Sequence, residues 1–367
     1  MDSKSSTINS AMPSIPPTMK AWRFHTTAGG TEKHMKLEDL TPPTSFHSLP
    51  PQSSLIKVEI VSLNPVDIKF AETPLVGPYL HPMPAIPGLD GVGRVVKTTD
   101  DTLHVGQLVM FRLLEKQPEG ALAEYVLVPS EGCVPVPSGV SPVQAATVGT
   151  CGVTACQAIT PFVSKYNSLK SEGEGPFKVF INGGSGGTGT FQIQIAKALG
   201  CYVITSCSTP NIELCKSLGA DEVIDYRLGP VEDALQEMVQ NRKMPPLDLV
   251  VDNVDLPWRL YKAATHYMKP EGTYVQVGGD VSWQGIKELF CIKLLPTSLG
   301  GGSRQWEFLA MKTSREDAER VLDWMQEGRI RIPVEEEFGF HEVPDAYRRL
   351  KAGRTRGKII VHVSNSE

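Results

Sequence analysis

The chain has 367 residues, which is long enough for two domains that each bury a hydrophobic core. Its 36 basic and 41 acidic residues give a net charge of −5 without a basic patch, which argues against a nucleic-acid partner. No apolar run approaches the roughly 18 residues that a membrane span requires, which argues against membrane insertion. The seven cysteines are scattered and form no Cys-x-x-Cys pair, a pattern that favours reduced, buried thiols in an intracellular protein.

Residues 1–18 are rich in Ser and Pro and show no periodicity of apolar residues. They lack the apolar region of a secretory signal and the Arg-rich amphipathic pattern of a mitochondrial one. We therefore expect a disordered tail over residues 1–18, a first strand near Met19 and a cytoplasmic location.

The chain from Met19 to about Thr150 is predicted to form a barrel-like β domain. Short apolar runs are separated there by Pro, Gly and Asp, which is typical of consecutive strands. The predicted strands are residues 55–64, 91–98, 107–113 and 121–129.

From about Thr154 onward, short apolar runs alternate with helical stretches, which predicts an α/β fold with a doubly wound parallel sheet. The predicted strands are residues 178–182, 201–206, 222–225, 248–252 and 272–278.

The last part of the chain is expected to fold back onto the first domain. It contains predicted helices at 315–327 and 343–352 and a terminal strand at 358–363. The predicted β-rich domain therefore comprises residues 19–153 and 304–367, and the α/β domain residues 154–303.

One turn carries the strongest functional signal. The predicted strand 178–182 is followed by Gly184-Ser185-Gly186-Gly187-Thr188-Gly189 and then by an amphipathic helix. In a dinucleotide site, the first glycine allows a sharp turn, the second removes a side chain that would block the phosphates, and the third lets helix and strand pack closely. The helix N-terminus offers free N–H groups and a partial positive charge to the pyrophosphate. The turn therefore predicts a nicotinamide dinucleotide site.

Further motifs accompany this turn. They are Asn64-Pro-Val-Asp67-Ile-Lys69, Ile86-Pro-Gly-Leu-Asp90-Gly-Val-Gly-Arg-Val, Gly120-Ala-Leu-Ala-Glu-Tyr125, Leu218-Gly-Ala-Asp-Glu-Val-Ile-Asp-Tyr226 and Thr355-Arg-Gly-Lys358-Ile-Ile. With them, the chain from Met19 to Val363 resembles the zinc-free quinone oxidoreductase and enoyl reductase branch of the medium-chain dehydrogenase/reductase superfamily. The resemblance implies a Rossmann domain, a GroES-like β-barrel domain and a small-molecule substrate.

A second resemblance rests on Cys207-Ser-Thr-Pro-Asn211 and Asp225-Tyr226-Arg227. These segments are similar to fungal enoyl reductases that serve polyketide synthases in trans, which implies a synthase as a partner.

The resemblance also bears on metal binding. Metal-dependent relatives hold catalytic zinc with Cys, a His–Glu pair and a later Cys or Asp. The first three of these positions are Asn64, Leu89 and Asp90 here, and Cys151 near the last one has no partners. A structural zinc would need four cysteines near residues 112–125, which contain none. We expect no metal, and without a Lewis acid conjugate reduction suits the site better than alcohol oxidation.

The end of the second predicted strand favours NADPH over NADH. NAD enzymes place an acid there to bind the ribose 2′-hydroxyl, whereas this chain has Ser206 at that position and Ser208 beyond it. Relatives often carry a Lys where this chain has Asn211. Lys216, Tyr226 and Arg227 are the remaining candidates for the 2′-phosphate, with a solvated helix residue as the alternative for Lys216.

Three residues are candidates for the substrate side of the site. Asn64 is a candidate donor to a substrate carbonyl or to the nicotinamide ribose. Lys69 is a candidate proton donor or oxyanion partner, with an exposed helix lysine as the alternative. Tyr79 lies where related quinone reductases have a Tyr facing the pocket.

The resemblance implies further cofactor contacts. Thr154 matches a threonine that touches the nicotinamide in relatives. Gly278 and Gly279 end a strand that lines the nicotinamide, and Asn253 follows the preceding strand near the ribose. Lys358 matches a position near the cofactor phosphate.

Three functions remain open on these observations. The first is an NADPH-dependent reductase of enones, enoyl thioesters or quinones. The second is an enoyl reductase acting in trans with a polyketide synthase, and the third is a cofactor-binding protein with a non-redox role. A homodimer and a monomer are both compatible with the apolar region near residues 284–300, which would hold the edge strand of a dimer.

Overall fold

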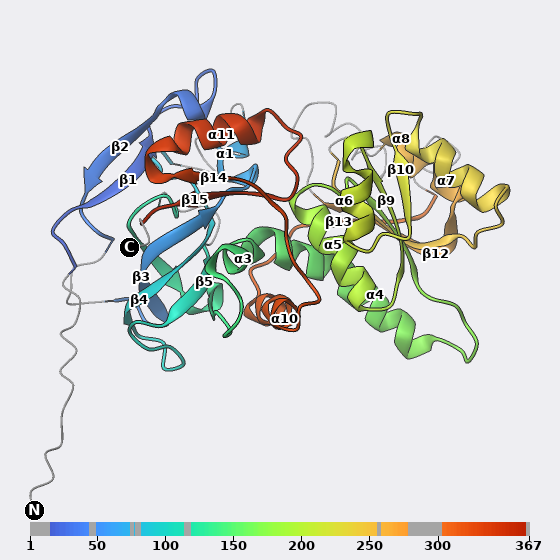
Figure 1. The fold of residues 1–367 in the computed structure, drawn as a ribbon, viewed down its shortest axis with the longest axis horizontal. Helices are drawn as coiled ribbons and strands as arrows, with labels where there is room; N and C mark the ends of the chain where they lie inside the picture. The colour runs from blue at the N-terminus through green and yellow to red at the C-terminus, as the bar shows by residue number, and fades with distance from the viewer. Residues whose placement is uncertain are drawn as a thin grey trace, which may run out of the picture.

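The computed structural model describes residues 15–43, 49–73, 77, 82–113, 119–254, 258–277 and 303–364. These residues form two lobes side by side (Figure 1), one built around an antiparallel β-sheet and the other around a parallel sheet. Within the described part of the chain, no helix is long and apolar enough to cross a membrane. The free cysteines among the described residues are all buried.

The first lobe consists of strands from both ends of the chain. Its two-stranded sheet pairs β1 (Met19–Phe24) with β2 (Met35–Leu40). Its seven-stranded sheet has the order β14-β15-β3-β4-β5-β7, with β6 pairing on β3. These strands are β3 (Ser53–Ser62), β4 (Asp90–Thr98), β5 (Leu108–Arg112), β6 (Tyr125–Pro129), β7 (Cys133–Pro135), β14 (Val334–Gly339) and β15 (Lys358–His362).

The C-terminal segment returns to this first lobe. The last strand, β15, runs antiparallel to β3, and α11 (Val343–Lys351) packs over β14 and β15. The short helices α1 (Val66–Lys69) and α3 (Pro142–Ala146) complete the lobe.

The second lobe is an all-parallel sheet in the order β10-β9-β8-β11-β12-β13. Its strands are β8 (Lys178–Asn182), β9 (Tyr202–Cys207), β10 (Glu222–Asp225), β11 (Leu247–Asp252), β12 (Met268–Val277) and β13 (Gln305–Leu309). Its helices are α4 (Val153–Leu169), α5 (Gly187–Ala198), α6 (Ile212–Ser217), α7 (Val231–Gln240) and α8 (Trp258–Lys262). The strand order reverses between β8 and β11, and ligands of such sheets bind in the crevice at the carboxyl ends of these two strands.

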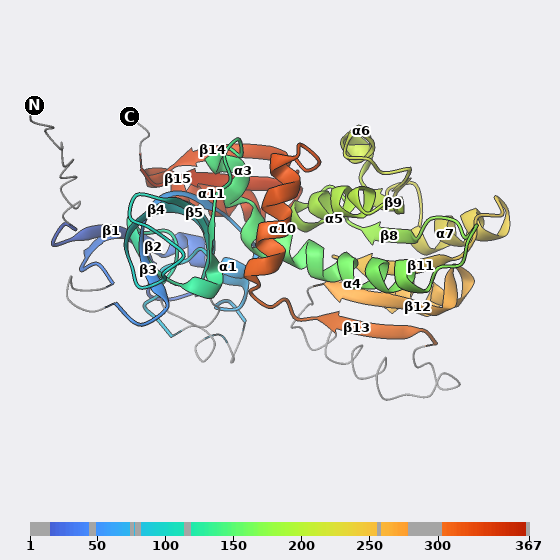
Figure 2. The same cartoon turned by 90° about the horizontal axis from the view of Figure 1, so that it is seen from below.

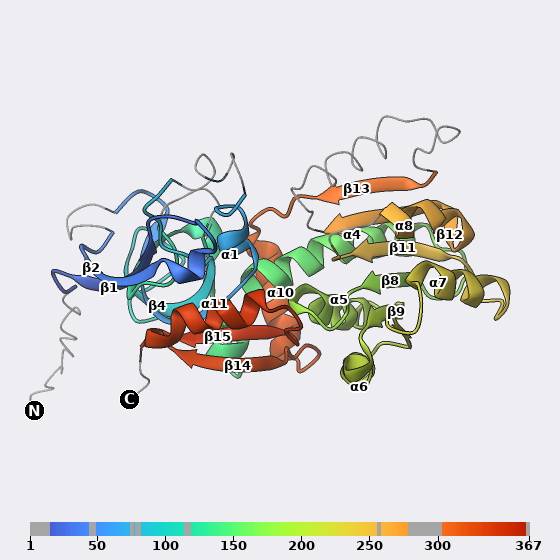
Figure 3. The same ribbon diagram turned by 90° about the horizontal axis from the view of Figure 1, so that it is seen from above.

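The position of β13 differs from the one implied by the domain boundary that the sequence predicts. The segment 304–367 was expected to join the β-rich domain, but β13 pairs in parallel with β12 at the edge of the second lobe's sheet. The parallel sheet therefore extends to Leu309, as the side views show (Figures 2 and 3). The expected dimer strand near residues 284–300 lies outside the described residues.

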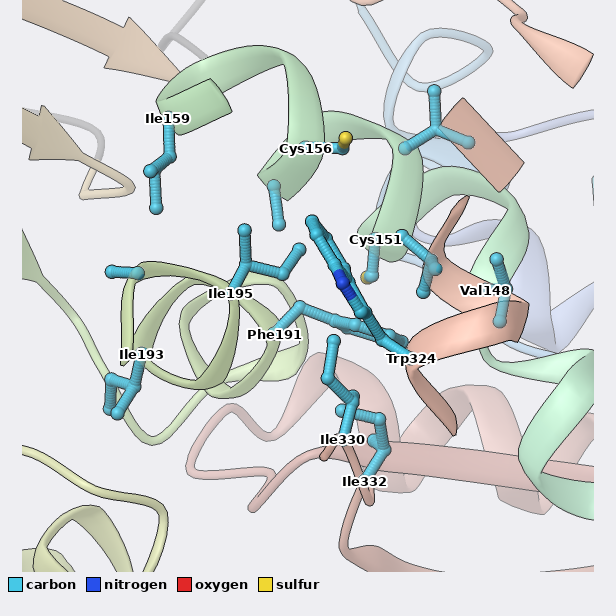
Figure 4. Packing of buried hydrophobic residues seen from close by; sticks show 14 of the residues in the cluster. Val148, Cys151, Cys156, Ile159, Phe191, Ile193, Ile195, Trp324, Ile330 and Ile332 are labelled. Carbon is cyan, nitrogen blue, oxygen red and sulfur yellow. The ribbon is translucent and has the colours of Figure 1, made fainter. Parts of the chain in front are cut away.

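The two lobes share one hydrophobic cluster. It includes Ile60 and Val92 from the antiparallel sheet as well as Val179 and Ile181 from the parallel sheet. At the centre of this cluster (Figure 4), Trp324 of α10 (Arg315–Gln326) lies beside other buried side chains. They are Phe191, Cys151, Ile330 and Ile332. Because the core is continuous, packing holds the lobes in a defined relation to each other.

We expect Phe191→Ala to destabilise the whole chain. Phe191 is fully buried in the shared cluster, and truncation of a buried Phe costs about 3–5 kcal/mol because it removes contacts and leaves a cavity. Urea unfolding followed by circular dichroism measures this loss. Leu228→Ala is the matched control, because Leu228 is 87% exposed. A Phe191→Ala variant as stable as the control would contradict the shared core.

Candidate active site

The turn after β8 depends on close backbone packing. β8 ends at Asn182, and Gly183 enters the turn with a φ of +83°, which glycine adopts without strain. A Cβ atom on Gly184 would clash with the Thr205 hydroxyl of β9, and one on Gly189 would clash with the Gly183 carbonyl. Gly184 and Gly189 are therefore required by the approach of β9 and α5 to the end of β8.

Gly186 has a different environment. The nearest atom to a Cβ built there is the Gly183 carbonyl oxygen at 3.7 Å, so the position borders open space. Gly186 is the N-cap of α5, and no side chain caps this helix. The first-turn N–H groups of a helix have no partners within it and form the positive end of its dipole. This open helix N-terminus at the strand-order reversal fits a dinucleotide pyrophosphate.

The start of α5 packs against residues of the first lobe and the lobe junction. A Cβ on Gly187 would lie 3.1 Å from the Cys151 sulfur and 3.2 Å from Lys358 Cδ. Thr188 Oγ1 donates to the Cys151 sulfur at 3.6 Å. Cys151 belongs to a π-helical turn, Val148–Gly152, a form of helix that is frequent at functional sites.

Ser206 holds the glycine turn. Its hydroxyl oxygen accepts from the Gly183 N–H at 3.0 Å, and its hydroxyl donates to Asn182 Oδ1 at 2.6 Å. Both of these bonds lie within the protein, so Ser206 shapes the turn that a cofactor would meet. Its predicted contact with a 2′-phosphate remains a prediction.

Asn211 joins two other predicted cofactor residues. Its amide Nδ2 donates to Ser185 Oγ at 3.1 Å and to Ser208 Oγ at 3.3 Å. Because both hydroxyl oxygens accept from the amide, each hydroxyl keeps its own proton to donate to a ligand. Asn211 Oδ1 is buried and has no hydrogen-bond partner among the described residues. The Ser185–Asn211–Ser208 cluster therefore offers neutral donors beside the turn.

The other candidates at this edge are less enclosed. Lys216 is exposed and its ammonium pairs with Glu213 Oε1 at 3.1 Å, while Tyr226 is 53% exposed. Asp225, for which no role was predicted from the sequence, ends β10 directly beside Cys207 of β9. Hydrogen bonds from the Thr209 hydroxyl, at 2.6 Å, and from the Arg227 N–H lower the pKa of Asp225. An ionised carboxylate thus lies at this edge, and its place at a strand end was the signal that could have revealed it.

Asn64 connects a buried carboxylate to a buried ammonium. Its Nδ2 donates to Asp90 Oδ2 at 2.8 Å and to the Ser62 carbonyl at 3.2 Å, and its Oδ1 accepts from Lys358 Nζ at 2.5 Å. Asp90 is fully buried and also accepts from the N–H and the hydroxyl of Thr150. Both Nδ2 protons are therefore donated within the protein. The predicted donation from Asn64 to a substrate carbonyl or to the nicotinamide ribose stays a prediction.

Lys358 lies beneath the start of α5. Its side chain is buried, and its ammonium donates to Asn64 Oδ1, to the Leu63 carbonyl at 2.9 Å and to the Cys151 sulfur at 3.5 Å. The preceding Gly357 N–H donates to the Ser185 carbonyl at 3.0 Å. The C-terminal strand of the first lobe is thereby bonded to the glycine turn of the second.

Two further predicted residues make structural hydrogen bonds. The Thr154 hydroxyl donates to the Thr150 carbonyl one turn earlier at 2.6 Å. Asn253 Nδ2 donates to the Asn182 carbonyl at 2.9 Å and to Gln192 Oε1 at 2.7 Å, which ties β11 to β8 and α5. Asn253 borders the glycine turn, since its Cβ lies 3.8 Å from a Cβ built on Gly183. The contacts of Thr154 and Asn253 with a cofactor remain predictions.

The chain is similar to known dehydrogenases and reductases. Residues 50–138 match the family model of the alcohol dehydrogenase GroES-like domain, and residues 218–361 match that of the zinc-binding dehydrogenases. The trans-enoyl reductase pgmF of Aspergillus terreus is 44% identical over 96% of this chain and 98% of its own length. The trans-enoyl reductase buaC of Petromyces alliaceus is 34% identical over 85% and 89%.

The fold shows the same relationship. The solved quinone oxidoreductase from Coxiella burnetii superposes with a TM-score of 0.77 and 26% identity, covering 95% of this chain and all of that one. The chain belongs to the medium-chain dehydrogenase/reductase superfamily, in its quinone oxidoreductase and enoyl reductase branch. It is an oxidoreductase that uses a nicotinamide cofactor. The predicted fold class, a Rossmann sheet with a GroES-like domain, is confirmed.

Three of the site residues predicted from the superfamily resemblance cannot be placed. Tyr79, Gly278 and Gly279 lie outside the described residues. Lys69 lies half-buried at the end of α1. Its proposed role as a proton donor stays a prediction.

The positions that hold zinc in metal-dependent superfamily members are occupied differently here. Asn64 and Asp90 are hydrogen-bonded to each other, and Leu89 between them in the motif is buried and apolar. Among the residues that the structure describes, no group of three or more His, Cys, Asp or Glu side chains is arranged to hold a metal ion.

Asp67 is a buried carboxyl directly behind Asn64. Its Oδ2 accepts from the Asn64 N–H at 2.8 Å and from the Tyr347 hydroxyl at 3.1 Å, while its Oδ1 is buried without a partner among the described residues. Burial raises the pKa of Asp67 from 3.8 to about 7, against the opposing effect of the Asn64 hydrogen bond. The folded protein therefore holds this proton at pH values at which the unfolded chain has lost it.

This raised pKa predicts that stability falls as the pH rises from about 4 to about 7. In that window the folded state binds more protons than the unfolded state, so unfolding is favoured by higher pH. Relative to Asp67→Asn, the wild type should lose up to about 4 kcal/mol of unfolding free energy across the window. Urea unfolding of both proteins at several pH values measures the difference. A difference that does not change with pH would show that Asp67 titrates normally.

Proposed function

We propose that this protein is an NADPH-dependent reductase that transfers hydride to an activated carbon–carbon double bond or to a quinone without a metal. The observation that carries the proposal is the open helix N-terminus at Gly186, placed at the reversal of strand order and bonded to the first lobe through Ser185 and Gly357. This arrangement suits a dinucleotide whose reactive ring extends toward the junction of the two lobes.

Different residues around the turn would contact different parts of the cofactor. The N–H groups at the start of α5 would hold the pyrophosphate, because they form the positive end of the helix dipole. Lys358, whose protons are donated to Asn64, Leu63 and Cys151, would add positive charge near them without bonding the cofactor. Asn253 and Thr154 would border the nicotinamide riboside, together with Gly278 and Gly279. When bound, the cofactor supplies the hydride.

NADPH is favoured over NADH by the donors at the end of β9. Ser185 and Ser208 each retain a hydroxyl proton for a ligand because Asn211 donates to both. Hydroxyl donors suit a 2′-phosphate, whereas a ribose 2′-hydroxyl is usually bound by an acid at the end of this strand. Ser206, Lys216 and Tyr226 complete this side of the proposed site.

The substrate would lie on the first-lobe side of the nicotinamide. Asn64 orders this side through its bonds to Asp90 and Lys358. Lys69 and Tyr79 are the proposed groups for polarising the substrate carbonyl or returning a proton to the reduced carbon, because general acids of this kind stabilise the developing enolate.

A substitution at Gly186 separates cofactor binding from folding. Gly186→Ala should leave the melting temperature unchanged, since its Cβ would meet no atom closer than 3.7 Å. The added methyl group should weaken NADPH binding at least about tenfold by obstructing the phosphates. Isothermal titration calorimetry measures the affinity, and Gly229→Ala, also in open space, is the control. Unchanged NADPH affinity in Gly186→Ala would place the pyrophosphate elsewhere.

Activity is tested by following NADPH absorbance with a panel of enones, enoyl thioesters and quinones. We expect oxidation of NADPH with at least one class, and slower oxidation of NADH. Tight NADPH binding without turnover on any compound would reject the reductase and favour a non-redox role.

A second candidate function is favoured by the relatives named trans-enoyl reductases, of which pgmF is 44% identical. In this form of the proposal, the substrate is an enoyl chain carried by a polyketide synthase. Reduction of synthase-bound chains, with no reduction of the same chains as free thioesters, would select this candidate over the first.

A further inference from the structure

A row of hydrogen-bonded side chains crosses the carboxyl end of the parallel sheet. Asn182 at the end of β8 lies opposite Asp252 at the end of β11. The Asn182 Nδ2 donates to Asp252 Oδ1 at 2.8 Å, and Asn182 Oδ1 accepts from the Ser206 hydroxyl of β9 at 2.6 Å. At the other end of the row, the Tyr274 hydroxyl of β12 donates to Asp252 Oδ2. The row therefore joins four neighbouring strands, which lie side by side in Figure 3.

The row lies in a part of the sheet that is otherwise apolar. Asp252 and Tyr274 are fully buried, and Ser206 is 1% exposed. Two residues before the row on their strands, Phe180 and Val250 face the same side of the sheet and pack in one apolar cluster with Tyr274. A buried carboxylate is costly unless hydrogen bonds compensate it, and apolar residues in its place are often as stabilising. The presence of Asp252 therefore indicates a role beyond packing.

Tyr274 fixes the orientation of the Asp252 carboxylate. Burial, together with the adjacent carboxylate, raises the pKa of Tyr274 well above the usual value of a tyrosine. The hydroxyl therefore keeps its proton and donates it to the carboxylate, and hydrogen bonds to carboxylates are stronger than those between neutral groups. This contact holds Oδ2 of the carboxylate toward β12 and leaves Oδ1 facing β8.

The row is bonded to the two loops that border the candidate cofactor crevice. Asp252 Oδ1 also accepts from the Val254 N–H at 2.9 Å, in the loop after β11. The Ser206 hydroxyl oxygen accepts from the Gly183 N–H at 3.0 Å, at the start of the glycine turn. The carboxylate is thus bonded directly to the loop after β11 and, through Asn182 and Ser206, to the turn after β8. These two loops follow the strands between which the strand order reverses.

We propose that Asp252 is a positioning residue for the dinucleotide and that Tyr274 holds its carboxylate in place. The carboxylate fixes the glycine turn and the loop after β11 relative to each other before the cofactor arrives. The turn then presents the N–H groups at the start of α5 to the pyrophosphate without further ordering, and preorganisation of this kind raises affinity. The inference rests on the proposed function and assigns a role in it to two buried residues that act through their neighbours.

The sharpest test removes one hydroxyl group from the buried end of the row. Tyr274→Phe keeps the aromatic ring but frees the Asp252 carboxylate to turn away from Asn182. We expect NADPH to bind at least about fivefold more weakly to this variant than to the wild type. Isothermal titration calorimetry on the full-length protein, far below the melting temperature, measures the affinity of the folded state.

Tyr267→Phe is the matched control. Tyr267 is fully buried in the same apolar cluster as Tyr274, but its hydroxyl donates to the Leu260 carbonyl instead of to the row. Each variant loses one hydroxyl hydrogen bond from a buried tyrosine, so the two melting temperatures should fall by similar amounts. Only Tyr274→Phe should weaken NADPH binding, because a loss of stability alone does not change the affinity of the folded protein.

A double-mutant cycle tests whether the effect of Tyr274 is transmitted through Asn182. Asn182→Ala breaks the link between Asp252 and Ser206 and leaves Tyr274 in place. In this background, Tyr274→Phe should weaken NADPH binding by about twofold or less, because residues of one hydrogen-bond network are energetically coupled. Equal losses in both backgrounds would contradict transmission along the row.

Two further results would overturn the inference. The first is an NADPH affinity of Tyr274→Phe equal to that of the wild type. The second is an equal loss of affinity in Tyr267→Phe, which would show that loosening of the cluster at any point weakens binding. Failure of the proposed function is distinct, because the wild type itself would then bind no NADPH.

Discussion

The structure depends on a buried ammonium at the junction of its two lobes. Lys358 donates to Asn64 Oδ1, the Leu63 carbonyl and the Cys151 sulfur, and the adjacent Gly357 bonds to Ser185. An unsolvated ammonium is costly unless its protons are donated, so these contacts have to form together. They fix the C-terminal strand, the end of β3 and the start of α5 relative to one another. The candidate cofactor site lies where these elements meet.

The same network explains why the site contains few reactive groups. The Asp90 carboxylate accepts hydrogen bonds from Asn64 and Thr150. The Asn64 side-chain amide lies between Asp90 and the Lys358 ammonium and is bonded to both. The polar side chains at the junction are therefore engaged in holding one another. Such an arrangement suits a reaction in which the cofactor carries the chemistry and the protein supplies orientation and electrostatics.

Much of the parallel sheet could be predicted from the sequence because its inner strands are buried on both faces and form continuous apolar runs. β8 and β10 have the predicted bounds. β13 could not be predicted in the same way, because its side chains are exposed or half-exposed at the sheet edge and show no apolar run. The glycine turn could be predicted because its glycines lie close together in the sequence, directly between the apolar run of β8 and the helical pattern of α5.

The contacts of the site could not be predicted. Lys358 and Asn64 are 294 residues apart in sequence, and no local pattern indicates that they bond. The same holds for the amide of Asn211 joining Ser185 to Ser208, and for the Asp225 carboxylate at the neighbouring strand end. Sequence motifs identified the residues, whereas their division into ligand-facing and positioning groups depends on tertiary contacts.

A crystal structure of the protein with NADPH tests the central claim most directly. The account predicts the pyrophosphate over Gly186 to Gly189 at the N-terminus of α5, with the nicotinamide at the junction of the lobes near the Asn64–Lys358 network. A cofactor bound at any other part of the sheet, or a nicotinamide pointing away from the first lobe, would contradict it.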